Sequence, residues 1–506
     1  MSTTESLQKV TIHFAGDSGD GIQLAGSQFT NTAALAGNDL STFPDFPAEI
    51  RAPMGTLAGV SGFQINFGSV AIETPGGRPD VLVAMNAAAY KKNIDNLKPG
   101  GVVVVDTAGF DKRNLRLAGY GGDANPLDHK PEGIQFYEID VTKLNREALK
   151  DLEVGRKDKD RSRNLFALGF LYYLYHRDME GTLQFLRDKF EATPEVWEAN
   201  VRSLKAGYNY GDTIEALTRY RVERAELPPG NYRNITGNQA LSYGLLSAAV
   251  QAQRELFYAG YPITPASDIL HELSRHKNFG AQTFQAEDEI AAITAAIGAS
   301  FAGSMAVTAT SGPGMALKGE GMGLALMLEL PLVIVNVQRG GPSTGLPTKT
   351  EQSDLFQALY GRNGEAPVPV VAASSPADCF QAAFDASRIA LEYMTPVILL
   401  SDGYLANGSE PWRFPQQEDL PSIKPPYAQS TEERNYLPYQ RDDRLVREWA
   451  LPGREGLEHR IGGLEKQAET GDVSYDPENH QKMVKIRAQK VQNIARDYGP
   501  TQLEQG

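Results

Sequence analysis

The 506-residue sequence predicts an α/β fold with two doubly wound domains, each on a mostly parallel sheet, followed by an extended C-terminal arm. Residues 1–205 and 233–418 alternate short apolar runs with helical patterns, which is typical of such domains. Residues 206–232, a polar segment with paired prolines, predict a linker. Residues 419–506 are rich in charge and lack a convincing strand pattern, so we expect an arm that wraps another surface.

The expected elements follow from hydrophobic periodicity. In the first domain we expect strands at 10–15, 62–67, 80–84, 101–106 and 135–139, and helices at 22–36 and 164–175. In the second we expect strands at 256–261, 304–309, 332–337, 368–372 and 396–401, and helices at 241–253, 268–277, 287–298, 314–330 and 376–392. The arm is expected to end in a helix at 480–498.

The composition excludes several classes of protein. Hydrophobic residues make up 41% and charged residues 22%, which is ordinary for globular domains. The net charge of -14 argues against binding to nucleic acid or to an anionic membrane, since either would need an extended basic field. The N-terminus lacks the apolar core of a signal peptide, and no apolar run is long enough to span a bilayer. We therefore expect a cytoplasmic protein.

The chain contains one cysteine, Cys379, which we expect to pack inside a helix. One thiol cannot form an internal disulfide, and it cannot by itself hold a structural zinc ion or an iron–sulfur cluster. Any iron–sulfur chemistry in this system must therefore belong to another chain.

A glycine-rich turn follows the first expected strand. The sequence GDSGDG comprises Gly16, Asp17, Ser18, Gly19, an aspartate and Gly21, and a helix is expected to begin directly after it. Glycines allow close approach of a ligand, and a helix N-terminus attracts phosphate, so a phosphate-bearing ligand is one interpretation. A tight turn without a ligand is the other. The spacing does not match the dinucleotide motif, which disfavours NAD.

Downstream, Glu49 and Arg51 stand two positions apart in FPAEIRAPMG. They could form a local ion pair that pins a loop, or Arg51 could lie near a ligand phosphate.

Four polar segments of the second domain follow expected strands or begin helices, where open α/β sheets bind ligands. They are YPITP at 261–265, QAEDEI at 285–290, TSGPG at 310–314 and QRGGPSTGLPTKTEQ from 338. Glu289 begins an apolar helix and faces away from Glu287, so its carboxylate is expected to point inward; simple N-terminal helix charge is the alternative.

Arg339 directly follows a buried strand, where its guanidinium suits a small carboxylate substrate. The alternative is a structural arginine that bonds loop carbonyls. Thr264, between two prolines, could contact the substrate or close a turn.

At these residues the sequence resembles the α subunit of the 2-oxoacid:ferredoxin oxidoreductases, which use thiamine diphosphate, and most closely the 2-oxoglutarate branch. YPITPASD, QAEDEIAAI, SGPG, GGPSTGLPTKTEQSDL and the tail HRIGGLEKQAETGDVSYDPENHQKMV carry the resemblance. The 1–205 region resembles the family's γ domain, fused before the pyrimidine-binding domain, so the resemblance spans almost the whole chain.

The resemblance implies roles for individual residues. Glu289 matches the acid that contacts N1′ of the aminopyrimidine and so promotes ylid formation. Thr264, Arg339 and Thr348 match substrate-binding residues, and Lys349 is our additional candidate for the distal carboxylate of 2-oxoglutarate. The resemblance also places Tyr261, Pro262, Ile263 and Gly312 on the thiamine diphosphate side. It implies that the turn from Gly16 to Gly21 would line a coenzyme A site, and we add Arg51 to that site.

The sequence also departs from a complete enzyme of this kind. Its only Gly-Asp-Gly lies in the other domain, and no Asn-Asn pair follows to complete a diphosphate-and-metal motif. The resemblance therefore implies a β partner that carries the diphosphate site, Mg²⁺ and a [4Fe-4S] cluster, in a dimer of αβ units that reduces ferredoxin; this chain itself would hold no metal. It also implies a further α/β domain after the arm.

The expected activity is oxidative decarboxylation of 2-oxoglutarate with coenzyme A, giving succinyl-CoA, CO₂ and reduced ferredoxin, or the reverse. Pyruvate or a branched-chain 2-oxoacid is the alternative substrate. A non-catalytic subunit that only binds coenzyme A or a partner protein is a second alternative, and it would not be an enzyme.

Overall fold

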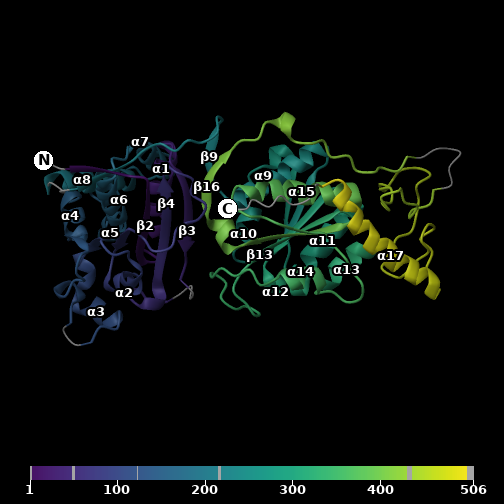
Figure 1. The fold of residues 1–506 in the computed structure, drawn as a ribbon, viewed down its shortest axis with the longest axis horizontal. Coiled ribbons are helices and arrows are strands. Elements are labelled where there is room, and N and C mark those ends of the chain that lie inside the picture. The colour runs from purple at the N-terminus through teal and green to yellow at the C-terminus, as the bar shows by residue number, and fades with distance from the viewer. Residues whose placement is uncertain (1–2, 48–51, 122–123, 215–217, 430–435, 499–506) are drawn as a thin grey trace. The chain divides into compact units, whose positions relative to one another are not determined.

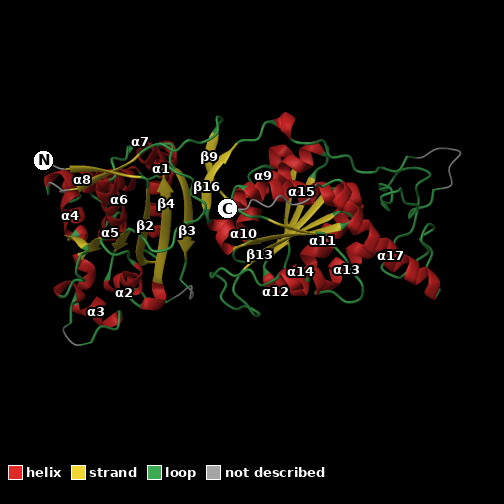
Figure 2. Cartoon of the chain, viewed as in Figure 1, coloured by secondary structure: helices red, strands yellow, loops and turns green. Residues whose placement is uncertain are grey.

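The computed structural model describes residues 3–47, 52–121, 124–214, 218–429 and 436–498. The chain divides into two compact units (Figure 1). Unit 1 comprises residues 1–234 and 408–414, and unit 2 comprises residues 235–407 and 415–506. Each unit contains a six-stranded, mostly parallel sheet with helices on both faces, which confirms the predicted fold class (Figure 2).

The sheet of unit 1 has the strand order β3-β4-β2-β5-β6-β7. Its strands are β2 (Lys9–Asp17), β3 (Asp39–Asp45), β4 (Val60–Gly68), β5 (Val81–Ala84), β6 (Val102–Asp106) and β7 (Gln135–Ile139). Strands β2, β5, β6 and β7 run parallel, whereas β4 pairs antiparallel with both β2 and β3. Strand β3 was not predicted, because polar residues and one proline interrupt its apolar pattern.

Helices cover both faces of this sheet and enclose two apolar clusters. They are α1 (Ile22–Leu35), α2 (Ala87–Asn93), α3 (Lys112–Leu117), α4 (Val141–Ala148), α5 (Arg156–Arg161), α6 (Arg163–Leu174), α7 (Glu180–Lys189) and α8 (Pro194–Thr213). Helices α6 and α8 approach closely at two glycines. A methyl group at Gly207 would lie 1.9 Å from the Phe166 carbonyl oxygen, and one at Gly169 would lie 2.0 Å from that of Leu204.

The segment predicted as a linker is structured in part. Helix α8 continues to Thr213, and β8 (Thr218–Val222) pairs parallel with β1 (Thr3–Leu7), which lies near the start of the sequence. Strand β9 (Tyr232–Thr236) pairs with β16 (Ser409–Arg413), and the division between the units falls within β9. Strands β1, β8, β9 and β16 were not predicted, because their pairing partners lie far away in the sequence.

The sheet of unit 2 is entirely parallel, in the order β11-β10-β12-β13-β15-β14. Its strands are β10 (Leu256–Gly260), β11 (Ala281–Gln285), β12 (Met305–Thr310), β13 (Leu332–Gln338), β14 (Val370–Ala372) and β15 (Pro396–Asp402). Strands β12, β13 and β15 are buried throughout, as expected for continuous apolar runs covered on both faces.

Helices α11 (Glu289–Phe301), α12 (Gly312–Leu317), α13 (Gly319–Leu328) and α14 (Leu355–Tyr360) contribute to the apolar cluster on one face. Helices α9 (Gly237–Gln251), α10 (Ser267–Leu273) and α15 (Asp378–Tyr393) pack together elsewhere in the unit (Figure 2). Helix α16 (Gly403–Asn407) follows β15. The predicted helix at 314–330 is thus two helices, which join at Lys318. Cys379 is fully buried in α15, where we expected it. Among the described helices, none combines the length and hydropathy needed to cross a membrane.

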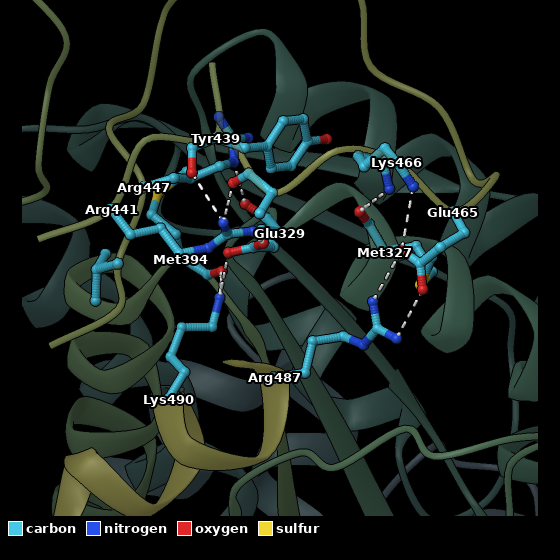
Figure 3. Close-up of polar contacts among 12 residues, drawn as sticks. Met327, Glu329, Met394, Tyr439, Arg441, Arg447, Glu465, Lys466, Arg487 and Lys490 are labelled. Atoms are coloured by element: carbon cyan, nitrogen blue, oxygen red, sulfur yellow. Dashed lines mark hydrogen bonds and ion pairs between the residues drawn. The ribbon is translucent and has the colours of Figure 1, made fainter. Parts of the chain in front are cut away.

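The C-terminal arm belongs to unit 2 and packs on it through a buried polar cluster around Glu329 (Figure 3). Glu329 ends α13 in a left-handed conformation, and its carboxylate accepts hydrogen bonds from Arg441 and, at 2.7 Å, from Lys490 Nζ. Lys490 lies on α17 (Pro477–Asn493). Arg447 donates to the Glu329 carbonyl oxygen at 3.1 Å, and Lys466 to that of Met327 at 3.0 Å. Ion pairs thus attach the arm to the end of one helix.

Candidate active site

The residues predicted to carry chemistry in unit 2 gather where the strand order reverses. After β10 the chain turns toward β11, whereas after β12 it turns the other way, toward β13. In open α/β sheets a crevice forms at such a point, beyond the carboxyl ends of the strands. Thr264 follows β10, Gly312 follows β12, Arg339 follows β13, and Glu289 begins the helix after β11.

Glu289 occupies the first turn of α11, and the residue is 8% exposed. Asp288 is the N-cap, and its carboxylate accepts a hydrogen bond from the Ala291 N–H at 2.7 Å. Capping is therefore the task of Asp288, and the inward Glu289 carboxylate remains available for other chemistry. Glu289 is also an acidic residue in the first turn of α11, so both interpretations of the sequence, helix charge and site residue, fit its position.

Arg339 links the loops that follow β10 and β13. Its Nη1 donates to the Thr264 carbonyl oxygen at 2.8 Å, and its Nη2 donates to that of Thr344 at 3.2 Å. Burial lowers the pKa of Arg339, and its electrostatic interaction with Glu289 opposes this shift. Arg339 therefore bonds loop carbonyls, as the structural alternative predicted, but it also faces the Glu289 carboxylate and an open pocket.

The pocket has a volume of about 660 Å³, and Gly312, Leu317, Arg339, Glu351 and Asp354 are among its lining residues. Asp354 accepts a hydrogen bond from Asn336 Nδ2 at 2.9 Å. A methyl group at Gly312 would lie 2.9 Å from Asp354 Oδ2, so a larger residue would enter space beside that carboxylate.

Thr348 and Lys349 belong to the loop after β13, which folds back on Gly340, the residue that follows Arg339. The Gly340 N–H donates to the Lys349 carbonyl oxygen at 2.9 Å, and the Leu346 N–H donates to the Gly340 carbonyl oxygen at 2.8 Å. Both predicted side chains are partly buried. The loop therefore brings the backbone of Lys349 next to the residue that follows Arg339.

Tyr261, Pro262 and Ile263 form the turn after β10, and the Thr264–Pro265 peptide bond is cis. Tyr261 is 38% exposed, and the Ile263 carbonyl oxygen accepts a hydrogen bond from the Ser267 N–H at 3.0 Å. The backbone of this turn is therefore fixed to the start of α10, while its outer surface is accessible.

Sequence reasoning missed two residues beside Glu289. A methyl group at Gly314 would lie 2.0 Å from Thr310 Oγ1 and 2.7 Å from Glu289 Cγ, so only glycine fits. Lys318, one helical turn later, is fully buried and donates to the Glu289 carbonyl oxygen at 2.8 Å. The available signal for Lys318 was a single lysine within an apolar, glycine-rich helical pattern.

In unit 1, the glycine-rich segment connects β2 to α1 as predicted, but β2 continues through Gly16 and Asp17, so the turn itself comprises residues 18–21. Gly21 is the N-cap of α1 in a left-handed conformation, with φ of 70°, and no side chain caps this helix. The Cα of Gly19 is open, since a methyl group there would meet nothing within 4 Å. Ser18 is exposed. The end of the turn can therefore be approached closely by a ligand.

Two buried aspartates use part of the turn's hydrogen-bonding capacity. The Gly55 N–H donates one bifurcated hydrogen bond to both carboxylate oxygens of Asp17, at 3.0 and 2.9 Å, and burial raises the pKa of this carboxyl group. Asp20 accepts a hydrogen bond from the Asp17 N–H at 2.9 Å and pairs with Arg163. Glu49 and Arg51 lie outside the described residues.

Two family models match the chain, one in each half. A model described as "Pyruvate ferredoxin/flavodoxin oxidoreductase" matches residues 11–210. A second, described as "Pyruvate flavodoxin/ferredoxin oxidoreductase, thiamine diP-bdg", matches residues 247–476 and so covers the crevice. The class defined by the fold and the site is thus a subunit of an oxidoreductase that works with ferredoxin or flavodoxin.

Individual relatives narrow this class. The chain is 55% identical over 493 residues to 2-oxoglutarate oxidoreductase subunit KorA of Mycobacterium tuberculosis, covering 97% of this chain and 75% of the relative. It is 30% identical to the α subunit of 2-oxoacid:ferredoxin oxidoreductase 1 of Aeropyrum pernix, with coverage of 83% and 68%. The chain therefore belongs to the 2-oxoacid:ferredoxin oxidoreductase family.

A solved structure agrees with this assignment. The 2-oxoglutarate:ferredoxin oxidoreductase from Magnetococcus marinus, with 2-oxoglutarate, coenzyme A and succinyl-CoA bound, is 34% identical and superimposes with a TM-score of 0.82. The match covers 98% of this chain and 82% of that one. The family resemblance predicted from the sequence motifs is confirmed, and it extends over both units. Several relatives are named as subunits, so the family forms multi-subunit enzymes.

Proposed function

We propose that this chain is the α subunit of a thiamine-diphosphate-dependent 2-oxoglutarate:ferredoxin oxidoreductase. The reaction converts 2-oxoglutarate, coenzyme A and oxidised ferredoxin into succinyl-CoA, CO₂ and reduced ferredoxin. The observation that carries the proposal is the electrostatic interaction of a buried carboxylate, Glu289, with the guanidinium of Arg339 at the switch point of a sheet within a matched thiamine-diphosphate-binding region. Similarity to the Mycobacterium tuberculosis and Magnetococcus marinus proteins supports 2-oxoglutarate as the substrate.

The residues at the crevice fit the aminopyrimidine half of thiamine diphosphate. Ser311 Oγ, Asn336 Oδ1 and Arg339 Nε are buried and have no hydrogen-bond partner among the described residues. A polar ligand would satisfy such atoms, which are costly when left unpaired. Glycine at position 314 keeps the space beside Glu289 clear of side-chain atoms.

Residues of this chain then have separate roles at the cofactor site. Glu289 would hold a ring nitrogen of the cofactor by a hydrogen bond, and Tyr261, Pro262, Ile263 and Gly312 would line its binding site. Bound thiamine diphosphate supplies a nucleophilic carbon for the 2-oxo group and an electron sink for decarboxylation.

The substrate residues lie on the neighbouring loops. Arg339 binds the carboxylate of the 2-oxoacid next to the reacting carbonyl, and the hydroxyls of Thr264 and Thr348 orient the substrate. Lys349 pairs with the distal carboxylate of 2-oxoglutarate.

The site requires a partner subunit, and the surface near it is suited to one. Ile290, Leu317, Phe356 and Tyr360 are between 52% and 75% exposed, and Leu317 lines the pocket itself. Phe356 and Tyr360 stack on each other, and exposed large apolar side chains are typical of protein interfaces. The partner is a β subunit that supplies the diphosphate and Mg²⁺ site and a [4Fe-4S] cluster for transfer to ferredoxin, in an (αβ)₂ assembly.

The glycine-rich turn of unit 1 serves coenzyme A. The open space at Gly19 lets a phosphate group approach the uncapped N-terminus of α1, with Asp17 and Ser18 beside it; Gly16 and Gly21 belong to the same segment, where Ile22 and Asn164 fill the space a side chain would need. Arg51 is the proposed basic contact.

The test is a substrate panel on the reconstituted αβ complex with a low-potential acceptor. Coenzyme A-dependent reduction with 2-oxoglutarate, at a higher kcat/KM than with pyruvate or a branched-chain 2-oxoacid, is expected. Equal or higher kcat/KM for pyruvate would overturn the substrate assignment. Absence of turnover with every 2-oxoacid would overturn the proposed function and favour a docking subunit.

A further inference from the structure

Lys318 lies one helical turn after Gly314, so the two residues share a helix face. Its side chain is fully buried. The ammonium nitrogen donates to the Glu289 carbonyl oxygen at 2.8 Å and to Thr308 Oγ1 at 3.1 Å. Lys318 thus joins the α12–α13 junction to the first turn of α11 and to β12.

Burial of a lone ammonium group is costly, so a buried lysine needs compensating charge. Burial lowers the pKa of Lys318 to about 8, and its interactions with Glu289 and Asp288 oppose that shift. Both acids lie at the start of α11. Strand β12 contributes the neutral hydroxyl of Thr308, and Arg339, after β13, interacts with the same Glu289 carboxylate.

A second buried lysine in the same unit provides a structural comparison. Lys466 is 2% exposed, its pKa is also lowered to about 8 by burial, and its Nζ donates to the Met327 carbonyl oxygen at 3.0 Å (Figure 3). It therefore fixes the far end of α13, whereas Lys318 fixes the end at the crevice. The two lysines share burial and bonding to a main-chain carbonyl, but only Lys318 contacts Glu289.

We propose that Lys318 is a positioning residue for the reaction. Its ammonium group holds the main chain of Glu289 against β12 and places a positive charge beside the Glu289 carboxylate. Activity therefore depends on a protonated Lys318. This inference rests on the proposed function, because it assigns a task to Lys318 only if Glu289 acts on the cofactor.

The experiment compares the Lys318→Gln variant with the matched Lys466→Gln variant in the reconstituted αβ complex. Glutamine keeps N–H donors but removes the charge. We measure kcat and KM for 2-oxoglutarate between pH 6 and 9.5, thiamine diphosphate affinity by calorimetry over the same range, and the melting temperature. Lys318→Met, an apolar near-isostere, provides a second variant if Lys318→Gln does not fold.

For Lys318→Gln we expect kcat to fall about 100-fold, as for a displaced catalytic group, with KM changed less than about threefold. Wild-type kcat and cofactor affinity should fall as the pH rises through about 8, where Lys318 loses its proton, and both dependences should vanish in Lys318→Gln. Lys466→Gln should lower only the melting temperature and keep the wild-type pH profile.

Two results would overturn the inference while leaving the proposed function intact. One is a Lys318→Gln complex with wild-type kcat and an unchanged alkaline limb. The other is an equal loss of activity in Lys318→Gln and Lys466→Gln, which would show that both lysines act only through stability. A wild-type complex that is inactive with every 2-oxoacid would instead refute the proposed function itself.

Discussion

Replacement of Glu329 by glutamine should weaken the packing of the C-terminal arm on unit 2 while leaving the sheet of unit 2 folded. Glu329 is 2% exposed as a side chain, and its two carboxylate oxygens pair with Arg441 and Lys490, which are 5% and 1% exposed. Burial opposes ionisation, but the two cations outweigh it and hold the pKa of Glu329 below its ordinary value. Glu329→Gln would leave both cations buried without a counter-charge.

The expected loss of stability can be worked from these contacts. Removal of one partner from a buried ion pair typically costs 3–5 kcal/mol. Lys490 and Arg441 keep main-chain acceptors, at Met394 and Tyr439, so the lower end of about 3 kcal/mol applies. For a unit of this size, about 3 kcal/mol corresponds to a melting temperature lower by roughly 6–12 °C.

Urea unfolding and calorimetry of the full chain measure this loss. Glu198→Gln removes an exposed ion pair with Arg202 and should change stability by less than about 1 kcal/mol. The triple variant Glu329→Met, Arg441→Met and Lys490→Met, which removes all three charges together, should recover most of the loss. A Glu329→Gln chain within 1 kcal/mol of wild type would refute the reasoning, because the buried cations would then need no carboxylate.

Three further outcomes are expected. Gly314→Ala should lower kcat about 100-fold in a folded complex, since its methyl group would displace the side chains of Thr310 and Glu289; wild-type kcat would contradict the packing. Burial lowers the pKa of His13 from 6.5 to about 4, so the unfolded chain takes up a proton first as the pH falls, and unit 1 should lose at most about 3 kcal/mol between pH 6.5 and 4. Urea midpoints at pH 7 and 5 should therefore differ less in His13→Gln than in wild type. Equal differences in the two proteins would show that His13 does not cause the loss of stability at low pH. Lys349→Ala should raise KM for 2-oxoglutarate at least tenfold without changing that for pyruvate; an equal rise for both would place Lys349 outside the distal-carboxylate site.

The sequence predicted those parts of the fold that depend on local pattern. Buried parallel strands such as β12 and β13 are largely apolar, and the polar segments after them predicted where the crevice lies. Strands β1 and β8 were missed because neither has a local apolar pattern, and their pairing joins residues more than 200 positions apart.

The site shows the same limit. Glu289 and Arg339 could be selected because each is a charged residue beside an apolar run. The role of Lys318 depends on acceptors at positions 289 and 308, which only the packing of α11, α12 and β12 brings together. Arg339 was predicted either to bind substrate or to bond loop carbonyls, and its several N–H groups allow both.

The central claim is that Glu289 acts in chemistry on a 2-oxoacid. The most direct measurement is coenzyme A-dependent turnover of 2-oxoglutarate by the αβ complex that carries Glu289→Gln, beside wild type and with thiamine diphosphate binding recorded for both. A loss of at least about 100-fold in kcat, with the complex still folded and loaded, is the predicted result. Turnover equal to wild type would contradict the claim.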